Sequence, residues 1–385
     1  MAGYDVTVLG ANFDPALKAR DLQLLDTLKF RYLPVVDTTI GGAENFVPRA
    51  KRKLGVMMHG TIGWENRWQL GYAYPQLRKA AFREKGDLYI AHMEQALAVA
   101  ADLHRSGRRV ALDLEDWYSQ DLLAEARRSR PVKLLASLER YVLQSAIYSS
   151  SPSHAMSAAL ASVYKCSPPA VIYNVFRWEE RKSIDGLTKD RRRLGRPSIH
   201  WFSQTIGQGR GLEDLLAALN YVKHDAEVHL RGKFATGYGE SLSARVPEQW
   251  RNRLFFHDLV HNDELLSRIA EHDIGFAGEE TKCLSRNLTV TNKFFQYLLG
   301  GLAVVASNTA GQHEIAEQAQ GAVFLYRAGE PSSLAAQLNK LLEAGPLLAE
   351  AKATALRVAE RTFCWEKQQA TLLTMIKNAN LFSDN

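Results

Sequence analysis

Short apolar runs alternate with stretches of helical periodicity along almost the whole chain. Stretches such as 93–106 and 212–222 repeat apolar residues at the spacing of one helix face, and shorter runs typical of strands lie between such stretches. This alternation indicates parallel sheets with crossover helices, so we predict an α/β fold class. The expected strands are 5–10, 31–36, 87–91, 109–114, 145–149, 170–173, 198–202, 226–231, 253–256, 274–277 and 303–307.

The length of the chain predicts two domains. Its 385 residues are too many for one compact domain of average size. The clearest boundary is the charged stretch 177–197, which has little apolar periodicity and ends in Gly-Arg-Pro before a clean strand. We therefore predict an N-terminal domain, a linker, a C-terminal domain and a C-terminal helix, over residues 1–180, 181–197, 198–363 and 364–385.

Composition indicates a folded protein of a reducing compartment. Hydrophobic residues make up 46% of the chain and charged residues 23%, without a long block of one sign. The three cysteines form no CxxC pair, which argues against a disulfide framework and against a zinc site. No apolar run reaches the roughly 18 residues of a membrane span, and the N-terminus resembles a strand more than a signal peptide. We expect a cytoplasmic location and no bound metal.

The net charge of +6 leaves two interpretations open. The basic residues are scattered over short runs, which are most often solvated faces. The alternative is a peripheral contact between one run and the inner face of the plasma membrane. No nucleic-acid-binding motif accompanies the runs, so no nucleic acid partner is expected. The basic runs are 49–53, 105–109, 127–130 and 189–196.

A glycine-rich loop follows the expected strand at 198–206. Residues 207–211 read Gly-Gln-Gly-Arg-Gly, and a helix follows at Leu212. Such a turn lets backbone N–H groups approach a phosphate at a helix N-terminus, and Arg210 adds forked donors suited to phosphate oxygens. The alternative is a plain turn with a surface arginine.

A second unit covers residues 273–307. A strand runs into a polar loop at 278–291, a helix opens at Asn292-Lys293, and Gly300-Gly301 precedes the next strand. Lys293 lies in the first helical turn, where a cation opposes the helix dipole. Its position is favourable when the same helix end binds an anion. The alternative is a tolerated surface lysine.

These segments together resemble a known family. Residues 291–316, 253–279 and 201–219 look like the nucleotide-sugar-binding region of GT-B glycosyltransferases, in the large retaining family that builds bacterial surface polysaccharides (group 1, family 4-like). Residues 138–164 and 171–176 resemble the end of its N-terminal domain. The resemblance covers most of 87–366 in order, and it implies two Rossmann-like domains facing a cleft.

The resemblance also implies a donor site. Arg210, with the loop at Gly209, and Lys293 would contact the donor diphosphate, and Glu280 would face the transferred sugar. Gln296 stands where the family has a glutamate that accepts hydrogen bonds from the ribose hydroxyls, which weakens that contact because an amide is uncharged. The residues implied to line the same pocket are Thr291, Asn292 and the backbone after Gly311.

In the N-terminal half, three carboxylates end one expected strand. Glu115 stands where many relatives carry an active-site histidine, and Asp113 and Asp116 flank it. They suit acid–base or acceptor-positioning roles, or alternatively loop hydrogen bonding and helix capping. Glu115 and Asp116 are the candidate catalytic residues here, and His92 is expected to be a structural hydrogen-bonding residue. Relatives begin with one more strand–helix unit than this chain, so we expect the N-terminal domain to lack its first unit.

The resemblance implies a metal-independent glycosyltransferase without a cofactor. It would move a sugar, with retention, from a nucleotide-diphosphate sugar to a saccharide or lipid-linked acceptor in surface polysaccharide synthesis. Gln296 and Glu115 favour an alternative, a catalytically degenerate binding partner in a polysaccharide assembly complex. A GT-B enzyme of another class, such as a sugar-nucleotide epimerase, is a third hypothesis. No GxGxxG follows the first strand, which argues against a nicotinamide-dependent dehydrogenase.

Overall fold

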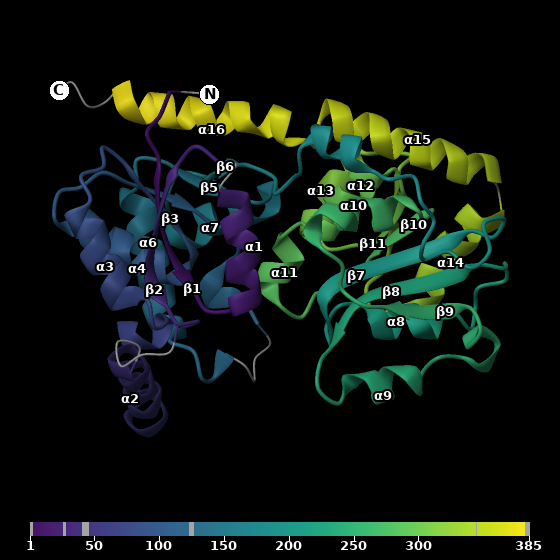
Figure 1. Ribbon diagram of the computed structural model, residues 1–385, viewed down its shortest axis with the longest axis horizontal. Helices are drawn as coiled ribbons and strands as arrows, with labels where there is room; N and C mark the ends of the chain where they lie inside the picture. The colour runs from purple at the N-terminus through teal and green to yellow at the C-terminus, as the bar shows by residue number, and fades with distance from the viewer. Residues whose placement is uncertain (1–2, 26–27, 41–45, 123–126, 344, 382–385) are drawn as a thin grey trace. The chain divides into compact units, whose positions relative to one another are not determined.

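The computed structural model describes residues 3–25, 28–40, 46–122, 127–343 and 345–381 (Figure 1). The chain forms two compact units, each built around parallel strands and helices, which confirms the α/β class. Unit 1 comprises Met1–Ser151, Ser157–Ala170 and Met375–Asn385, and unit 2 comprises Pro152–Met156 and Val171–Thr374. The long C-terminal helix α16 (Trp365–Leu381) therefore contributes to both.

Unit 1 contains a four-stranded sheet in the order β3-β4-β5-β6. β4 pairs in parallel with both β3 and β5, and its apolar residues Val110 and Leu112 are fully buried. The strands are β3 (Tyr89–His92), β4 (Val110–Asp113), β5 (Ser149–Ser151) and β6 (Ala170–Val171). One expected strand is displaced: β5 begins at 149 rather than 145, because the preceding helix continues to Ser145.

A separate two-stranded parallel sheet precedes the four-stranded one along the chain. β1 (Thr7–Asn12) and β2 (Arg31–Asp37) are joined by α1 (Pro15–Leu25), which supplies the crossover that a parallel pair requires. A Cβ atom on Gly10 would lie 2.6 Å from the ring of Tyr32, so a larger residue there would require that ring to move. The other helices of this region are α2 (Phe46–Ile62), α3 (Tyr74–Arg83), α4 (Met93–Arg105), α6 (Val132–Ser145) and α7 (His154–Tyr164).

Unit 2 contains a six-stranded parallel sheet in the order β12-β11-β10-β7-β8-β9. The chain begins at the centre of the sheet, builds one half outward, and returns to build the other half. This is the doubly wound order of Rossmann-like domains, and its switch point lies between β7 and β10. The strands are β7 (Ser198–Ile206), β8 (Glu227–Phe234), β9 (Leu254–His257), β10 (Ile274–Ala277), β11 (Ala303–Ser307) and β12 (Val323–Tyr326).

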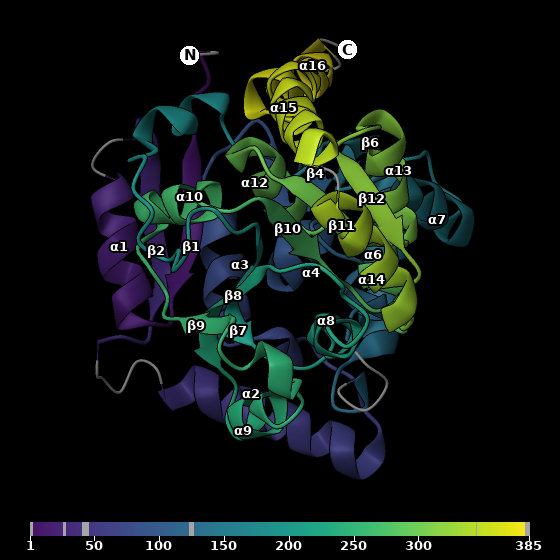
Figure 2. The same ribbon diagram turned by 90° about the vertical axis from the view of Figure 1, so that its right-hand side faces the viewer.

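Helices cover both faces of the unit 2 sheet. Trp201 and Phe202 are neighbours in β7 but belong to different apolar cores, because successive residues of a strand point to opposite faces. α8 and α14 pack on the Trp201 side, and α12 packs on the Phe202 side (Figure 2). The helices are α8 (Leu212–Ala218), α9 (Tyr238–Ser243), α10 (Asn262–Ala270), α11 (Leu284–Leu288), α12 (Asn292–Gly300), α13 (Ala310–Gln318), α14 (Pro331–Glu343) and α15 (Gly345–Arg361).

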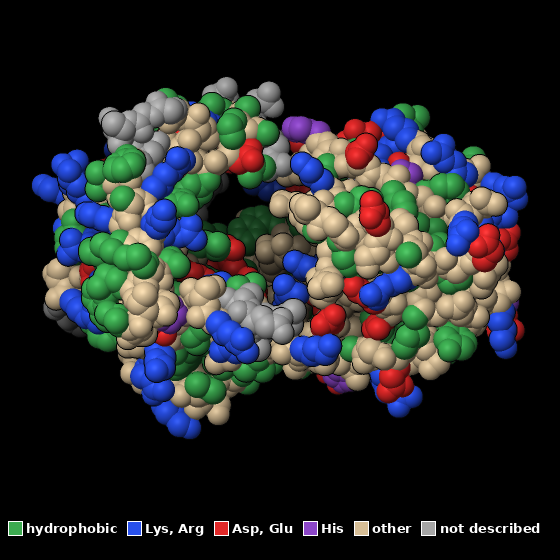
Figure 3. All heavy atoms as spheres, turned by 90° about the horizontal axis from the view of Figure 1, so that it is seen from below, with side chains coloured by type: hydrophobic (Ala, Val, Ile, Leu, Met, Phe, Trp, Pro, Cys, Tyr) green, Lys and Arg blue, Asp and Glu red, His purple; other side chains and the backbone are tan. Residues whose placement is uncertain are grey.

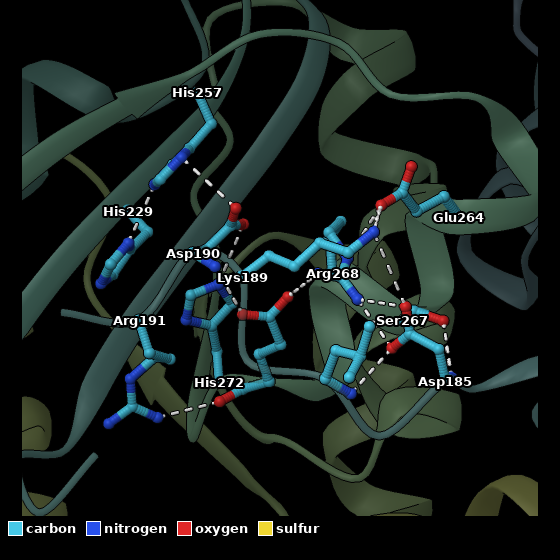
Figure 4. A network of polar contacts seen from close by, with 12 residues as sticks. Asp185, Lys189, Asp190, Arg191, His229, His257, Glu264, Ser267, Arg268 and His272 are labelled. Atoms are coloured by element: carbon cyan, nitrogen blue, oxygen red, sulfur yellow. Dashed lines mark hydrogen bonds and ion pairs between the residues drawn. The ribbon is translucent and has the colours of Figure 1, made fainter. Parts of the chain in front are cut away.

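The segment 181–197, for which the sequence predicts a linker, lies within unit 2. Some of its charged side chains pair with residues elsewhere in this unit (Figure 4). Asp185 accepts two hydrogen bonds from Arg268 at 2.7 Å, and Asp190 accepts one from Arg231 at 2.5 Å. Part of the charge in this segment therefore forms ion pairs within unit 2, while Lys182 and Lys189 remain exposed. Of the helices that the structure describes, none is both long and apolar enough to cross a membrane.

Candidate functional site

The two loops at the switch point of unit 2 come into direct contact. In open parallel sheets, ligands bind outside the carboxyl ends of the strands at this point. β7 ends at Ile206 and is followed by the glycine loop, and β10 ends at Ala277 and is followed by Gly278. Gly211 has φ +70°, and a Cβ atom there would lie 2.9 Å from the Cα of Gly278. The loops therefore meet backbone to backbone, which requires glycine at position 211.

A buried carboxylate with two cations lies just beyond these loops. The Oε1 atom of Glu279 is 3.4 Å from Nζ of Lys293 and 3.6 Å from Nη1 of Arg210. Glu279 and Lys293 keep only 4% and 7% of their side-chain surface exposed, whereas Arg210 keeps 37%. The backbone N–H of Glu279 donates to Oγ of Ser307 at 2.9 Å, which holds the acid at the end of its strand.

Lys293 is not the solvated lysine of the alternative interpretation. Burial lowers its pKa below the ordinary value, and Arg210 acts in the same direction, while Glu279 opposes the shift. The first turn of α12 adds partial positive charge from its free N–H groups. The site thus gathers more positive charge than the single carboxylate of Glu279 balances. An anion with several oxygens would be favoured at such a place.

A third cation joins the loop from α11. Nη1 of Arg286 donates to the carbonyl oxygen of Gly209 at 3.2 Å, and its charge also lowers the pKa of Lys293. Arg286 lies 76 positions beyond Arg210 in the chain, so only the fold brings the two together. No sequence pattern singled out this arginine, because the stretch 278–291 has no apolar periodicity and is expected to be a polar loop, although residues 284–288 form α11.

The remaining predicted donor residues surround the same helix start. Oγ1 of Thr291 lies 3.3 Å from Nζ of Lys293. Asn292 is exposed and accepts a hydrogen bond from Nδ2 of Asn174 at 2.9 Å. Gln296 is half-buried one turn further along α12. Glu280 is also half-buried, and its carboxyl carbon lies 4.0 Å from the position of a Cβ atom on Gly209.

Close backbone packing requires glycine at position 311. A Cβ atom there would lie 2.5 Å from the carbonyl oxygen of Leu288 and 2.6 Å from that of Thr289. It lies in the first turn of α13, whose N-cap Thr309 accepts a hydrogen bond from the backbone of Gln312. Gln312 in turn donates from Nε2 to both oxygens of Ser307. The residue therefore allows α13 to approach α11 and support Ser307 beside Glu279.

In unit 1, the carboxyl ends of β3 and β4 bring His92 and Asp113 together. Nδ1 of His92 lies 3.0 Å from Oδ2 of Asp113, and Ser150 donates to the other oxygen at 2.5 Å. The bond to Asp113 raises the pKa of His92, although burial acts against the shift. Burial would raise the pKa of Asp113, but the bonds from His92 and Ser150 outweigh it and lower that pKa. His92 does form a hydrogen bond, as expected, and half of its side chain is exposed.

The two predicted catalytic carboxylates of unit 1 follow this pair. Glu115 is exposed, and its charge contributes to the raised pKa of His92. Asp116 is half-buried in the turn before Trp117. The turn after β3 is strained, since Met93 has φ +71° and its N–H donates to the hydroxyl of Tyr118 at 3.1 Å. Non-glycine residues rarely adopt this conformation, so the turn presents His92 at an energetic cost.

No family model matches the chain, and no curated protein sequence does. Solved structures match over nearly its whole length. A sucrose-phosphate synthase from Thermosynechococcus elongatus gives a TM-score of 0.71 at 12% identity, covering 99% of this chain and 97% of that one. A UDP-forming trehalose-phosphate synthase from Burkholderia xenovorans gives 0.70 at 13%, covering 98% and 100%. HepE from Anabaena in complex with UDP-glucose gives 0.69 at 18%, covering 97% and 99%. This chain has the GT-B fold.

The site at the switch point contains residues that the sequence predicts and others that it does not. Arg210, Lys293 and Thr291, which the resemblance assigns to a donor site, lie together around Glu279. The buried partner of both cations is Glu279, which directly precedes Glu280, the acidic residue that the resemblance assigns to the sugar. Strand alternation does not separate the two, because β10 ends before either residue. In the part of the GT-B chain that the structure describes, no three His, Cys, Asp or Glu side chains are arranged to hold a metal ion.

Proposed function

We propose that the chain is a glycosyltransferase that binds a nucleotide-diphosphate sugar in unit 2 and transfers its sugar. One observation carries this proposal: Arg210, Arg286 and Lys293 gather around the glycine loop at the switch point of a doubly wound sheet. A diphosphate supplies the oxygens that forked guanidinium groups and helix N–H groups bind best. The GT-B fold supports the same assignment by analogy.

The chain's own cations would provide the electrostatic part of the reaction. When the bond between the sugar and the diphosphate breaks, negative charge develops on the leaving oxygen. Preorganised cations aimed at such charge are among the largest catalytic contributions that proteins make. Arg210 and Lys293 lie where they would supply this stabilisation without a metal ion or a cofactor, which is how we propose that the enzyme works.

Glu279 would hold the two cations in place before the donor binds. Its carboxylate pairs with the two cations that a diphosphate would neutralise. Donor binding would therefore shift contacts of Arg210 and Lys293 from Glu279 to the diphosphate. Glu280, half-buried beside the glycine loop, is the proposed contact to the transferred sugar. Gln296 and Asn292 would line the nucleotide side, with Gln296 as an uncharged acceptor. Since HepE is known in complexes with UDP and UDP-glucose, UDP conjugates are the first donors to test.

Unit 1 would handle the acceptor. The pair of His92 and Asp113, with Glu115 and Asp116 close along the chain, offers a half-exposed imidazole hydrogen-bonded to a carboxylate, an arrangement that suits proton transfer. We propose a saccharide or lipid-linked acceptor, retention of configuration, and a role in surface polysaccharide synthesis in the cytoplasm, each of which follows from the family resemblance.

A second candidate is a catalytically degenerate binding partner in a polysaccharide assembly complex. Two observations favour it: Gln296 is uncharged where the family has a glutamate, and Glu279 already neutralises part of the cationic site. In this case the chain would bind a nucleotide sugar and transfer nothing.

Binding and turnover together separate the two candidates. The purified chain is screened by thermal shift against UDP, GDP, ADP and CMP and their sugar conjugates. Ligand at 100 times its dissociation constant adds about 2.7 kcal/mol to the free energy of unfolding. We expect a shift with one nucleotide that Lys293→Gln abolishes and the control Lys182→Gln, an exposed lysine, preserves. Release of free nucleotide with a saccharide acceptor then indicates transfer. A folded chain that no nucleotide stabilises would overturn both candidates.

A further inference from the structure

Helix α2 is attached to the rest of unit 1 along one narrow line. It packs against the short helix η2 (Arg67–Leu70). Among the residues of α2 whose burial the structure describes, only Gly55 is buried. A Cβ atom on Gly55 would lie 2.7 Å from Oδ1 of Asn66 and 3.3 Å from Cβ of Trp68. Arg52 lies over the ring of Tyr72 at 4.7 Å. In Figures 1 and 2 the helix lies at the lower end of unit 1.

The face of α2 that points away from this contact is apolar. Phe46, Leu54 and Met57 recur at helical spacing on one side, offset from the side of Gly55. Their exposed fractions are 74%, 42% and 57%, so the structure leaves them in solvent. A surface helix normally buries such a stripe against its own core. The large apolar residues of α2 that are exposed are Phe46, Val47, Leu54, Val56, Met57 and Ile62.

Basic residues flank the apolar stripe on both sides. Arg49 and Lys53 adjoin it on one side and Lys51 on the other, and all three are exposed. The sequence from 46 to 62 contains no aspartate or glutamate. The space-filling view shows hydrophobic and basic side chains together over α2 (Figure 3). An apolar stripe with a cationic border is complementary to a binding surface with an apolar interior and anionic groups at its boundary.

We propose that α2 is an interfacial helix that binds this protein to an anionic lipid bilayer. The helix lies in the plane of the headgroups, with Phe46, Leu54 and Met57 directed toward the acyl chains and Lys51 and Lys53 beside the lipid phosphates. A bilayer is favoured over a protein groove for two reasons. The cations border the stripe on both flanks, and α2 has no acidic residue that could pair with a specific basic residue of a protein partner. This inference goes beyond the donor site, and its test requires no sugar transfer.

The 385-residue chain is tested by co-sedimentation with vesicles of phosphatidylcholine, with and without about 30% phosphatidylglycerol. We expect binding to the anionic vesicles that weakens between 0.1 M and 1 M salt, because the Debye length falls from about 10 Å to about 3 Å. Replacing Phe46, Leu54 and Met57 by serine should reduce partitioning by about 100-fold or more, since three large apolar groups no longer leave water. Lys51→Glu with Lys53→Glu should reduce it by at least about fivefold per charge.

A matched control uses three exposed leucines of unit 2. Leu187, Leu194 and Leu259 have exposed fractions of 53%, 69% and 51%, and serine at these positions should leave vesicle binding unchanged. All substituted side chains are exposed, so equal unfolding temperatures confirm that the variants fold. Absence of binding by the wild-type chain, or equal binding by the variant of α2, would overturn the proposal. Self-association that the α2 variant abolishes, without vesicle binding, would overturn it in favour of a second copy.

Discussion

Nζ of Lys293 lies 3.4 Å from Oε1 of Glu279, and both side chains are more than nine-tenths buried. The two residues are 14 positions apart, at the start of α12 and after the end of β10. Arg210 approaches the same oxygen from the glycine loop at 3.6 Å. One carboxylate therefore organises two cations from separate elements. The charge balance at this point should govern both the stability of unit 2 and its affinity for anions.

Removing the charge of Glu279 should separate these two effects. Glu279→Gln leaves Lys293 buried without its ionic partner, which should lower the free energy of unfolding by about 3 kcal/mol. The thermal shift produced by UDP or another bound nucleotide diphosphate should become larger, because the ligand now supplies the missing negative charge. Differential scanning calorimetry with and without nucleotide measures both quantities.

The adjacent glutamate is the control for this change. Glu280→Gln alters a half-buried group and should change stability by no more than about 0.5 kcal/mol. If Glu280 contacts the sugar as proposed, its loss should reduce turnover without this loss of stability. Equal destabilisation by the two variants would contradict the central place of Glu279.

The contact between the two loops predicts a steric effect at Gly211. Gly211→Ala combines left-handed backbone strain of about 1–2 kcal/mol with a Cβ atom placed 2.9 Å from the Cα of Gly278. The loops must separate, so nucleotide binding should weaken by at least about tenfold as the phosphate contacts move. Isothermal titration calorimetry measures this loss.

Gly237 provides a matched control for the strain. It also precedes a short helix and has φ +74°, but a Cβ atom there meets no atom within 4 Å. Gly237→Ala should therefore lower stability by a similar strain energy and leave nucleotide affinity unchanged. If the two variants bind nucleotide equally well, the loop contact is not part of the binding site.

A buried histidine cluster predicts that unit 2 loses stability in acid. His200 and His272 stack with ring centres 4.3 Å apart, and His229 lies 4.7 Å from His272 (Figure 4 shows His229 and His272 beside Asp190). Burial lowers the pKa of all three, that of His229 to about 2. The unfolded chain therefore binds more protons than the folded chain from about pH 6.5 downward, and stability falls with pH over that range.

The slope of this loss can be measured and altered. Each histidine that stays neutral when folded adds up to about 1.4 kcal/mol per pH unit between its two pKa values. Neither ring nitrogen of His200 has a hydrogen-bond partner in the part of the chain that the structure describes. His200→Phe should therefore reduce the slope of the unfolding free energy between pH 6 and pH 4, measured by urea titration. The exposed His313→Phe should leave the slope unchanged.

The pair of His92 and Asp113 in unit 1 predicts the opposite dependence of stability on pH. Asp113 raises the pKa of His92 in the folded state, so this pair stabilises the fold below pH 6.5 and the contribution is lost as pH rises through the folded pKa. Asp113→Asn should lower the pKa of His92, as followed by the NMR shift of its ring protons. Glu115→Gln should lower it less, because Glu115 acts only through its more distant charge. A larger effect of Glu115 would place that residue, rather than Asp113, beside the imidazole.

Local pattern was sufficient for much of the fold. The alternation of strand and helix periods predicted the parallel sheets, since each period is set by neighbours within a few residues. β12 was not predicted, although the apolar run 322–326 carried its signal. Arg210 and Lys293 could also be found in advance, because a glycine turn before a helix and a cation at a helix start are themselves local features.

Only the tertiary structure decided which distant groups meet. The sequence alone predicted the α/β class and a phosphate-binding loop. It did not distinguish Glu279 from Glu280, bring Arg286 to the loop, or place Asp190 among buried histidines. The distances between such residues depend on how strands order in a sheet, and the sequence does not encode this order within a short window. Burial likewise lowers the pKa of Lys293, and its extent could not be read from the sequence because desolvation depends on every segment that packs around a group.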